Sequence, residues 1–279
     1  MATYEGYTTA EEFHEGYDNF ITPQVVAHWE AIFRADSART LAERPDRREL
    51  RYGPGARNAI DFFPAAGVPV APLLVATHGG LWFLFDKWFM HFLAGAFNRA
   101  GVHVACINYG LAPANDLSGI VAECRAAVAH LRSEAPALGI DGKRISVLGH
   151  SAAGQLAALV AADQTLKLHA WIGVSGFYDI EPFAQTHFHT FTKFPLEQYA
   201  AWNPLRHVSA QTPPALLITG ARESSLLQQM TAHEAAALRA HGVPVETICA
   251  PGESHFSVLH AIGDATSPLF AAALRRVLG

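Results

Sequence analysis

The sequence lacks three features that would each point to a class of protein: a surplus of basic side chains, a cysteine framework and a long apolar run. Its 279 residues include 20 Lys and Arg against 25 Asp and Glu, so the formal net charge is −5. Nucleic-acid binders neutralise phosphates with a basic surface, and this balance excludes that class. With 50% hydrophobic and 16% charged residues, the chain is too apolar for disorder and can bury a large core.

Disulfide, targeting and membrane signals are also missing. Cys106, Cys124 and Cys249 are odd in number and lack C-x-x-C spacing, which argues against a disulfide framework or a zinc site and fits a reducing compartment. Residues 1–19 contain no Lys or Arg and no apolar run, so we expect no signal or transit peptide and a cytoplasmic protein. Glycines, a histidine and charged residues interrupt the most apolar stretch, residues 72–97, so we predict no membrane helix.

Short β-branched or aromatic segments alternate with amphipathic helical segments along most of the chain. The predicted strands are 59–63, 73–77, 102–108, 145–148, 170–174, 215–219 and 245–249. The main predicted helices are 87–99, 117–132, 154–162, 228–240 and 268–278. This alternation predicts an α/β fold with a mostly parallel central sheet flanked by helices, in which the chemistry collects at the carboxyl ends of the strands.

Two segments stand outside this alternation. Residues 8–44 have apolar side chains at helical spacing, and we predict an N-terminal helical arm over residues 1–48. Residues 177–206 are rich in Phe, His, Thr and Pro and separate two predicted strands that a much shorter connection would normally join, so we predict a cap insertion. We expect residues 1–279 to form a single domain that carries both.

The strongest motif is a serine in a tight turn between a predicted strand and a predicted helix. The segment G-H-S-A-A-G at 149–154 is the context that a nucleophile elbow requires, because the bend presents the serine hydroxyl and needs small neighbours. The usual pattern is G-x-S-x-G, whereas Ala153 occupies the second glycine position here and Gly154 follows it. We predict Ser151 as a nucleophile, with a glycine-rich turn and an incidental serine as the alternative.

A second motif, H-G-G-L-W at 78–82, follows the predicted strand 73–77. Gly79 and Gly80 leave backbone N–H groups free to point into a cleft, which suits an oxyanion hole, and the N–H of Ala152 is the remaining donor. Taken alone, the two glycines could equally form a simple turn. Their pairing with the serine turn favours the oxyanion hole.

The base and the acid are expected later in the chain, each just beyond a strand end. Glu223 follows the predicted strand 215–219, and His255 follows the predicted strand 245–249. His255 would accept the proton of Ser151, and Glu223 would orient the imidazole and stabilise its protonated form. Glu253 competes for the role of acid, but it lies beside His255 on the same turn and cannot easily reach behind it.

The 15 histidines invite a metal site, but we predict none and expect no cofactor. The segment H-F-H at 187–189 has no nearby carboxylate, and H-E-A-A-A at 233–237 lacks the second histidine of a zinc-protease helix. Aromatic residues beside the motifs are instead candidates for a substrate-binding wall. They are Trp82, Phe177, Tyr178 and Phe256.

Together the motifs resemble one branch of a known family. H-G-G-L-W, G-H-S-A-A-G-Q-L-A, S-G-F-Y-D and G-E-S-H-F look like the kynurenine formamidase (arylformamidase) branch of the hormone-sensitive-lipase-like α/β-hydrolases, as do Y-G-P-G at 52–55 and N-Y-G-L-A-P at 108–113. The resemblance runs from about residue 52 to the C-terminus. It implies the α/β-hydrolase fold and the same nucleophile, acid, base and oxyanion donors. Ala153 in the serine turn, and Glu223 where Asp is common, depart from the usual pattern.

We therefore predict a cofactor-free serine hydrolase that cleaves a small, aromatic amide or ester through an acyl-enzyme. A carboxylesterase on small aryl or alkyl esters is the alternative among enzymes, and a non-catalytic ligand-binding protein is the alternative from another class. The small-molecule substrate is the expected partner, with no nucleic acid and no membrane. The choice between a monomer and a homodimer stays open.

The charge of the substrate is a further question that the predicted cap raises. N-formylkynurenine carries a carboxylate, which a selective pocket would pair with a cation or several donors. The candidates are Lys193, Arg206, His187, His189 and Arg222. The phenyl-rich run Phe183, Phe188, Phe191 and Phe194 favours uncharged aryl substrates instead.

Overall fold

The computed structural model describes residues 3–18 and 21–279. Within them, eight strands form a single sheet in the order β1-β2-β4-β3-β5-β6-β7-β8. The strands are β1 (Arg48–Arg51), β2 (Ala59–Phe63), β3 (Ala71–Thr77), β4 (His103–Ile107), β5 (Ile140–His150), β6 (Ala170–Val174), β7 (Ala215–Gly220) and β8 (Val245–Ala250). All neighbours from β4 to β8 pair in parallel, whereas β2 pairs antiparallel with both β1 and β4. The predicted α/β class with a mostly parallel sheet is confirmed.

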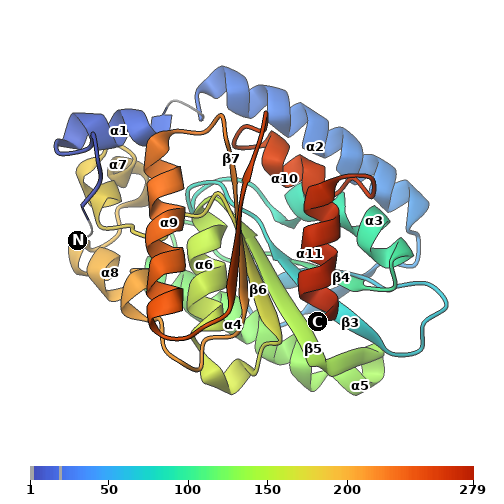
Figure 1. The fold of residues 1–279 in the computed structure, drawn as a ribbon. Helices are drawn as coiled ribbons and strands as arrows, with labels where there is room; N and C mark the ends of the chain where they lie inside the picture. Colours follow the sequence, from blue (N-terminus) through green and yellow to red (C-terminus); the bar gives the residue numbers. More distant parts are fainter. Residues whose placement is uncertain (1–2, 19–20) are drawn as a thin grey trace.

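Helices cover both faces of this sheet (Figure 1). One face carries α3 (Leu93–Arg99), α10 (Ser257–Ile262) and α11 (Pro268–Leu278), and the other carries α4 (Leu117–Ser133), α5 (Ala135–Leu138), α6 (Ala152–Ala161) and α9 (Ser225–Ala240). The core is accordingly divided into two apolar layers. Leu73 and Val75 of β3 belong to one layer, and Leu74 and Ala76 belong to the other, so the strand is buried on both faces. Double burial explains its nearly continuous apolar sequence.

The predicted arm consists of two helices rather than one continuous helical segment. They are α1 (Ala10–Asp18) and α2 (Pro23–Glu43). The Thr22 hydroxyl accepts a hydrogen bond from the Val25 N–H and Pro23 occupies the first turn, so this sequence starts a new helix there. Met1, Ala2, Asn19 and Phe20, which belong to the predicted arm, lie outside the described residues.

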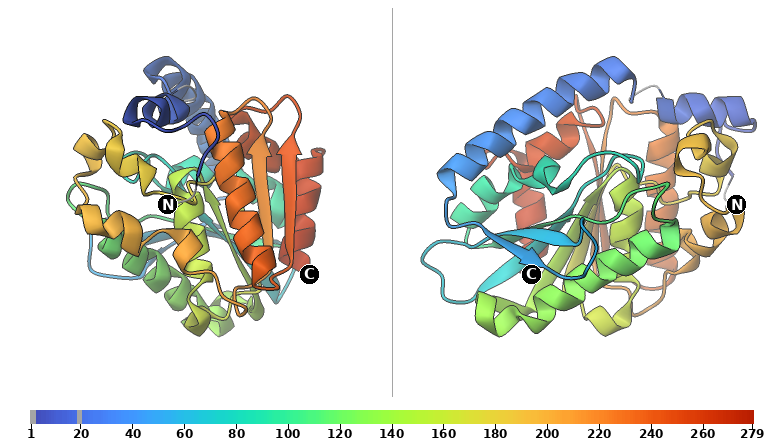
Figure 2. Two further views of the ribbon diagram at one scale, coloured as in Figure 1. Left: turned by 60° about the vertical axis from the view of Figure 1, so that its left-hand side comes forward. Right: turned by 180° about the vertical axis from the view of Figure 1, so that it is seen from behind.

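Helix α2 lies along the top of the molecule, above α10 and α3 (Figures 1 and 2). Two consecutive side chains of α2 fix it there. Asp36 lies 2.7 Å from His260 Nε2 of α10, and Ser37 Oγ lies 2.9 Å from His91 Nδ1. The other nitrogen of His91 lies 2.8 Å from Asp61 of β2, so a buried Ser–His–Asp chain connects α2 to the sheet.

The predicted insertion, residues 177–206, connects β6 to β7 through four short helical segments. They are η3 (Pro182–Gln185), α7 (His189–Thr192), α8 (Leu196–Ala201) and η4 (Pro204–Arg206). Figure 1 places α1 beside α7, so the arm and the insertion lie together at one end of the molecule. None of the helices among residues 3–18 and 21–279 combines the length and apolarity needed to cross a membrane.

Candidate active site

Five adjacent strands end at one edge of the sheet, and each is followed by a residue of the candidate site. Because β3, β5, β6, β7 and β8 are neighbours and parallel, their carboxyl ends meet. The residues that follow them, in the same order, are Gly79, Ser151, Ser175, Glu223 and His255. Residues separated by up to 176 positions in the chain are thereby brought together.

Ser151 occupies a strained bend between β5 and α6. Its φ and ψ are 60° and −127°, and its N–H donates to the Val174 carbonyl of the neighbouring strand at 2.9 Å. A positive φ is uncommon for a residue with a Cβ, and such strain is typical of functional sites. The close approach behind the bend occurs at Gly154, where a Cβ would lie 2.5 Å from the Gly176 Cα. The glycine is therefore needed at 154, one position later than in the usual motif, and Ala153 is accommodated.

The three predicted catalytic side chains form a continuous chain of contacts. His255 Nε2 lies 3.0 Å from Ser151 Oγ, and His255 Nδ1 lies 3.4 Å from Glu223 Oε1. All three residues are buried. This is the order of contacts by which a base takes a serine proton while a carboxylate holds the imidazole. Glu253 is not the carboxylate that the structure places beside His255 Nδ1.

Burial shifts the pKa values of both His255 and Glu223. It lowers the pKa of His255, which keeps the imidazole in the neutral form that can accept a proton. It also raises the pKa of Glu223, and the hydrogen bond from Ser175 and the nearby His150 act in the opposite direction. The ionised form of the Glu223 carboxylate is therefore stabilised by Ser175 and His150 against the effect of burial.

The three predicted oxyanion donors all lie against Ser151 or the cavity in front of it. Gly80, with φ +102°, lines that cavity. Gly79 lies so close that an added Cβ would be 3.1 Å from the Ser151 Cβ. Ala152 is the first residue of α6, where backbone N–H groups have no acceptor within the helix. The arrangement can present donors to an oxygen bound in front of Ser151.

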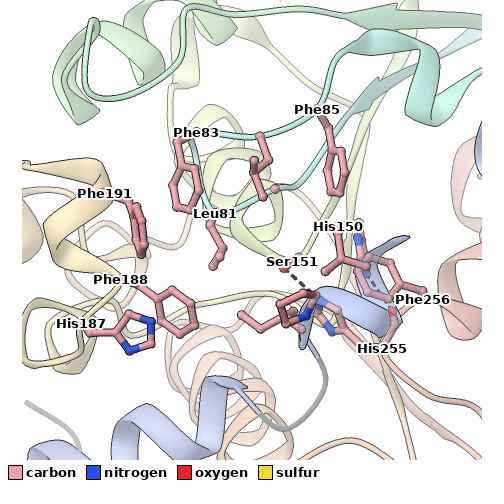
Figure 3. Close-up of a pocket in the computed structure, with 15 residues that line it drawn as sticks. Leu81, Phe83, Phe85, His150, Ser151, His187, Phe188, Phe191, His255 and Phe256 are labelled. Carbon is pink, nitrogen blue, oxygen red and sulfur yellow. Dashed lines mark hydrogen bonds between the residues drawn. The ribbon is translucent and has the colours of Figure 1, made fainter. Parts of the chain in front are cut away.

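An apolar cavity of about 290 Å³ opens in front of Ser151 (Figure 3). Its walls come from the loop after β3, the start of α2, the insertion, and the turns that carry the serine and the histidine. The lining residues are Ile21, Pro23, Val26, Gly80, Leu81, Phe83, Leu84, Phe85, His150, Ser151, His187, Phe188, Phe191, His255 and Phe256. The cavity therefore offers an apolar surface with few polar groups beside the serine, as small-molecule sites do.

Of the four aromatic residues predicted to bind substrate, Phe256 lines this cavity and the other three do not. Trp82, Phe177 and Tyr178 have no exposed surface. Trp82 packs edge-on against Phe177 and two phenyl rings of the insertion, and its indole N–H donates to a buried amide. Their large rings fill the interior between the sheet and the insertion, so these three predictions are corrected.

The five residues that were candidates for pairing a substrate carboxylate do not gather at the cavity. Lys193 and Arg222 are exposed, and Arg206 pairs with Glu181 at 2.7 Å. His189 Nδ1 lies 2.9 Å from the Tyr199 hydroxyl. His187 alone of these candidates lines the cavity.

The phenyl-rich run of the insertion divides between the cavity and the core. Phe188 and Phe191 line the cavity, whereas Phe183 and Phe194 are buried against the Trp82 ring. Half of the run therefore forms part of the apolar cavity wall, together with side chains of the loop after β3. The other half holds the insertion to the core.

Sequence reasoning missed two residues that support the site. His150 Nε2 lies 2.8 Å from the His255 carbonyl oxygen, so it can donate to it and hold the backbone of the candidate base. Ser175 Oγ donates to Glu223 Oε1 at 2.5 Å. Both lie inside segments that carried motifs, G-H-S and S-G-F-Y-D, but their partners are about 50 and 100 residues away in the chain and only the fold identifies them.

We expect Ser175→Ala to move the acid limb of the pH profile of kcat/KM to higher pH. The lost hydrogen bond stabilises the Glu223 carboxylate, so its removal raises the pKa of Glu223 further and lowers the ionised fraction at a given pH. Profiles of the wild type and the variant, measured on one substrate, test this. Ser146→Ala, which removes a buried hydroxyl of β5 that has no hydrogen-bond partner in the described part of the chain, is the control. An unchanged limb in Ser175→Ala would contradict the role.

A family model described as the alpha/beta hydrolase fold matches residues 74–259, two thirds of the chain. The chain belongs to the α/β-hydrolase family. The match spans the serine turn, the loop after β3 and the candidate acid and base. All of these candidate residues therefore lie within the part of the chain that the family model matches.

Curated relatives at similar sequence identity include members of two groups. Kynurenine formamidase from Danio rerio is 25% identical over 250 residues, covering 85% of this chain and 84% of the relative. A probable isoprenylcysteine alpha-carbonyl methylesterase from Arabidopsis thaliana is 24% identical over 241 residues, and the match covers 75% of this chain but half of that protein's length.

Solved structures share the fold over nearly the whole chain. A protein proposed to be a thioesterase, from Silicibacter sp. TM1040, superposes with a TM-score of 0.82 at 24% identity, covering 96% of this chain and 99% of that one. A bacterial heroin esterase superposes with a TM-score of 0.69 at 24% identity, covering 92% and 89%. The relatives therefore agree on the architecture and differ in their substrates.

Proposed function

We propose that this protein is a serine hydrolase that cleaves small, neutral, aromatic or otherwise apolar esters or amides. The observation that carries the proposal is the buried contact chain from Ser151 Oγ through His255 to Glu223, which meets an apolar cavity at the serine. A strained serine, a neutral imidazole within hydrogen-bond distance and a carboxylate behind it are the parts that nucleophilic acyl transfer needs.

The proposed reaction has two halves. In the first, Ser151 Oγ attacks the substrate carbonyl carbon and its proton passes to His255 Nε2, while backbone N–H groups of Gly79, Gly80 and Ala152 hold the oxyanion. The tetrahedral species then collapses, the bond to the leaving alcohol or amine breaks, and His255 protonates the leaving atom. In the second half, water gives a proton to His255 and attacks the acyl-enzyme, and the acid is released as Ser151 regains its proton.

The wall of the cavity supports a neutral substrate. None of the residues lining it in the described part of the chain is Lys or Arg, and its phenyl rings come from both the loop after β3 and the insertion. Burying a carboxylate without a paired cation costs several kcal/mol, so an apolar wall disfavours it. Phe83 and Phe191 stack with centroids 5.4 Å apart, which makes a flat surface suited to an aromatic ring.

The relatives support hydrolysis of this kind without selecting one leaving group. Their names include a formamidase, which acts on an amide, and methylesterases and other esterases, which act on esters. An arylformamidase and a carboxylesterase differ in the protonation that the leaving group needs, and an arylamine requires more help than a phenoxide. The same three side chains can serve both.

We expect neutral aryl esters and aryl formamides to be processed at least as well as N-formylkynurenine. The physical reason is the apolar wall, which offers a substrate carboxylate no lysine or arginine partner. Steady-state kcat/KM values for short aryl esters, simple aryl formamides and N-formylkynurenine, measured side by side, test both the proposed function and this ranking.

Two outcomes of that comparison would count against the proposal. A preference of 100-fold or more for N-formylkynurenine, about 2.7 kcal/mol, would contradict the neutral substrate class and point to a carboxylate clamp. Turnover of none of these substrates would contradict the assignment as a hydrolase of this class. It would favour the alternative, a non-catalytic protein that binds a small ligand in the cavity.

A further inference from the structure

Residues 80–85, here called the oxyanion loop, have one member that faces away from the cavity. Five of the six line the cavity, and the sixth, Trp82, is fully buried on the opposite side. Three non-glycine residues of the loop have a positive φ: Leu81 at 52°, Trp82 at 62° and Phe85 at 71°. Such backbone costs free energy at each residue and persists only where surrounding contacts hold it. Contacts with the rest of the protein must therefore hold the loop in this conformation, and the fully buried Trp82 side chain makes such contacts.

The partner of Trp82 is an amide on the nucleophile helix. The Trp82 indole N–H donates to Gln155 Oε1 at 3.0 Å, and Gln155 is fully buried, one helical turn after Ser151. The same amide reaches the insertion, because Gln155 Nε2 donates to the Trp202 carbonyl at 2.9 Å. Trp202 directly follows α8, and its own indole donates to Ser118 of α4 at 2.8 Å. One side chain thus connects the nucleophile helix, the oxyanion loop and the insertion.

The chemistry of the two contacts fixes the amide and limits what can replace it. An indole nitrogen only donates and a carbonyl oxygen only accepts, so Oε1 must face Trp82 and Nε2 must face Trp202. A glutamate could accept from Trp82 but would have no proton for the Trp202 carbonyl when ionised. An apolar side chain would leave both buried groups unpaired, which is costly.

We propose that Gln155 is a positioning residue that holds the oxyanion loop in register with Ser151. The inference rests on the proposed serine-hydrolase function. It assigns Gln155 no contact with the substrate: the amide acts through Trp82 on the loop that carries Gly80. Because oxyanion donors stabilise the transition state more than the bound substrate, displacement of the loop should lower kcat more than it raises KM.

The sharpest test removes the donor and the amide separately. Trp82→Phe deletes the indole N–H together with the five-membered ring and keeps a six-membered aromatic ring, and Gln155→Met removes both amide contacts at similar volume. We expect each to lower kcat by about tenfold or more, with KM within about threefold of the wild type. The double variant should lose no more than Gln155→Met alone, because both substitutions break the same link. Gln155→Glu, which keeps an acceptor for Trp82, should retain more kcat than Gln155→Met.

A second measurement separates positioning from a general loss of packing. An arylboronic acid that forms a tetrahedral adduct with Ser151 uses the oxyanion hole, so its inhibition constant should rise in step with the fall in kcat. Asn98→Leu is the matched control. The Asn98 amide is buried and donates to the Phe63 and Val102 carbonyls at 3.0 and 2.8 Å, away from the cavity. It should lower the melting temperature and leave kcat and boronate binding within about twofold.

The possible outcomes separate this inference from the proposed function. If folded Trp82→Phe and Gln155→Met keep kcat and boronate affinity within twofold while the wild type is active, the positioning role is wrong and the hydrolase stands. If Gln155→Met does not fold, Trp82→Phe alone decides, since it removes the indole N–H and keeps an aromatic ring in the core. If the wild type turns over no ester or amide, the proposed function has failed and not this inference alone.

Discussion

Replacement of Ser151 by alanine is expected to lower kcat by about four orders of magnitude or more, leaving the residual catalysis that binding and the oxyanion donors can supply. The reason is that the proposed covalent intermediate forms only on Ser151 Oγ, which is 3.0 Å from His255 Nε2. Single-turnover and steady-state kinetics on an activated aryl ester would measure the loss. Intact-mass analysis after treatment with a fluorophosphonate should show one adduct on the wild type and none on the variant.

The fold supplies a matched control for this substitution. Ser37 is also buried and also hydrogen-bonded to a histidine, with Oγ 2.9 Å from His91 Nδ1 and Asp61 behind that ring. It lies in the middle of α2, where backbone N–H groups are used within the helix, so no oxyanion hole faces it. Ser37→Ala should keep turnover and the fluorophosphonate adduct. Retention of most turnover in Ser151→Ala would exclude Ser151 as the nucleophile.

The parts of the fold that the sequence predicts best are those whose burial leaves a periodic or continuous apolar pattern. The segments 59–63 and 170–174 coincide with β2 and β6, and 268–278 coincides with α11. Strand β1 (Arg48–Arg51) went unpredicted because it is a polar, largely exposed edge strand with no apolar alternation to reveal it. Helices α7 and α8 of the insertion have four and six residues, which is too short for helical periodicity to be read.

In the candidate site, the residues that local turns place could be predicted from the sequence, whereas those that tertiary packing orients could not. Ser151, Glu223 and His255 each follow a strand end, so the order of elements was enough to predict that they meet. The direction of Trp82 was not predictable in this way. Its neighbours Leu81 and Phe83 face the cavity, but Trp82 faces the core, and only the buried acceptor on Gln155 distinguishes it. The sequence therefore locates the turns, and packing decides which side chains of each turn meet the substrate.

Gly79→Ala is expected to lower kcat/KM by about 100-fold or more without unfolding the protein. A Cβ at position 79 would lie 2.6 Å from the His150 carbonyl oxygen and 3.1 Å from the Ser151 Cβ. Both neighbours belong to the serine turn, and one of them is rigid backbone, so the loop after β3 must move away from Ser151. Loss of a single oxyanion donor costs about 10² to 10³ in kcat, and a displaced loop should cost a comparable amount.

The control for Gly79→Ala is another glycine-to-alanine change in which the added methyl group meets nothing. Gly142 lies in β5, and a Cβ there would have no heavy atom within 4 Å. Gly142→Ala should therefore leave kcat/KM unchanged, so a loss confined to Gly79→Ala reports on the space beside Ser151 and not on glycine replacement in general. Thermal unfolding of both variants separates the loss of activity from a loss of stability. If folded Gly79→Ala kept kcat/KM within a few-fold of the wild type, the loop after β3 would not be the source of the oxyanion donors, and donors elsewhere around Ala152 would have to be sought.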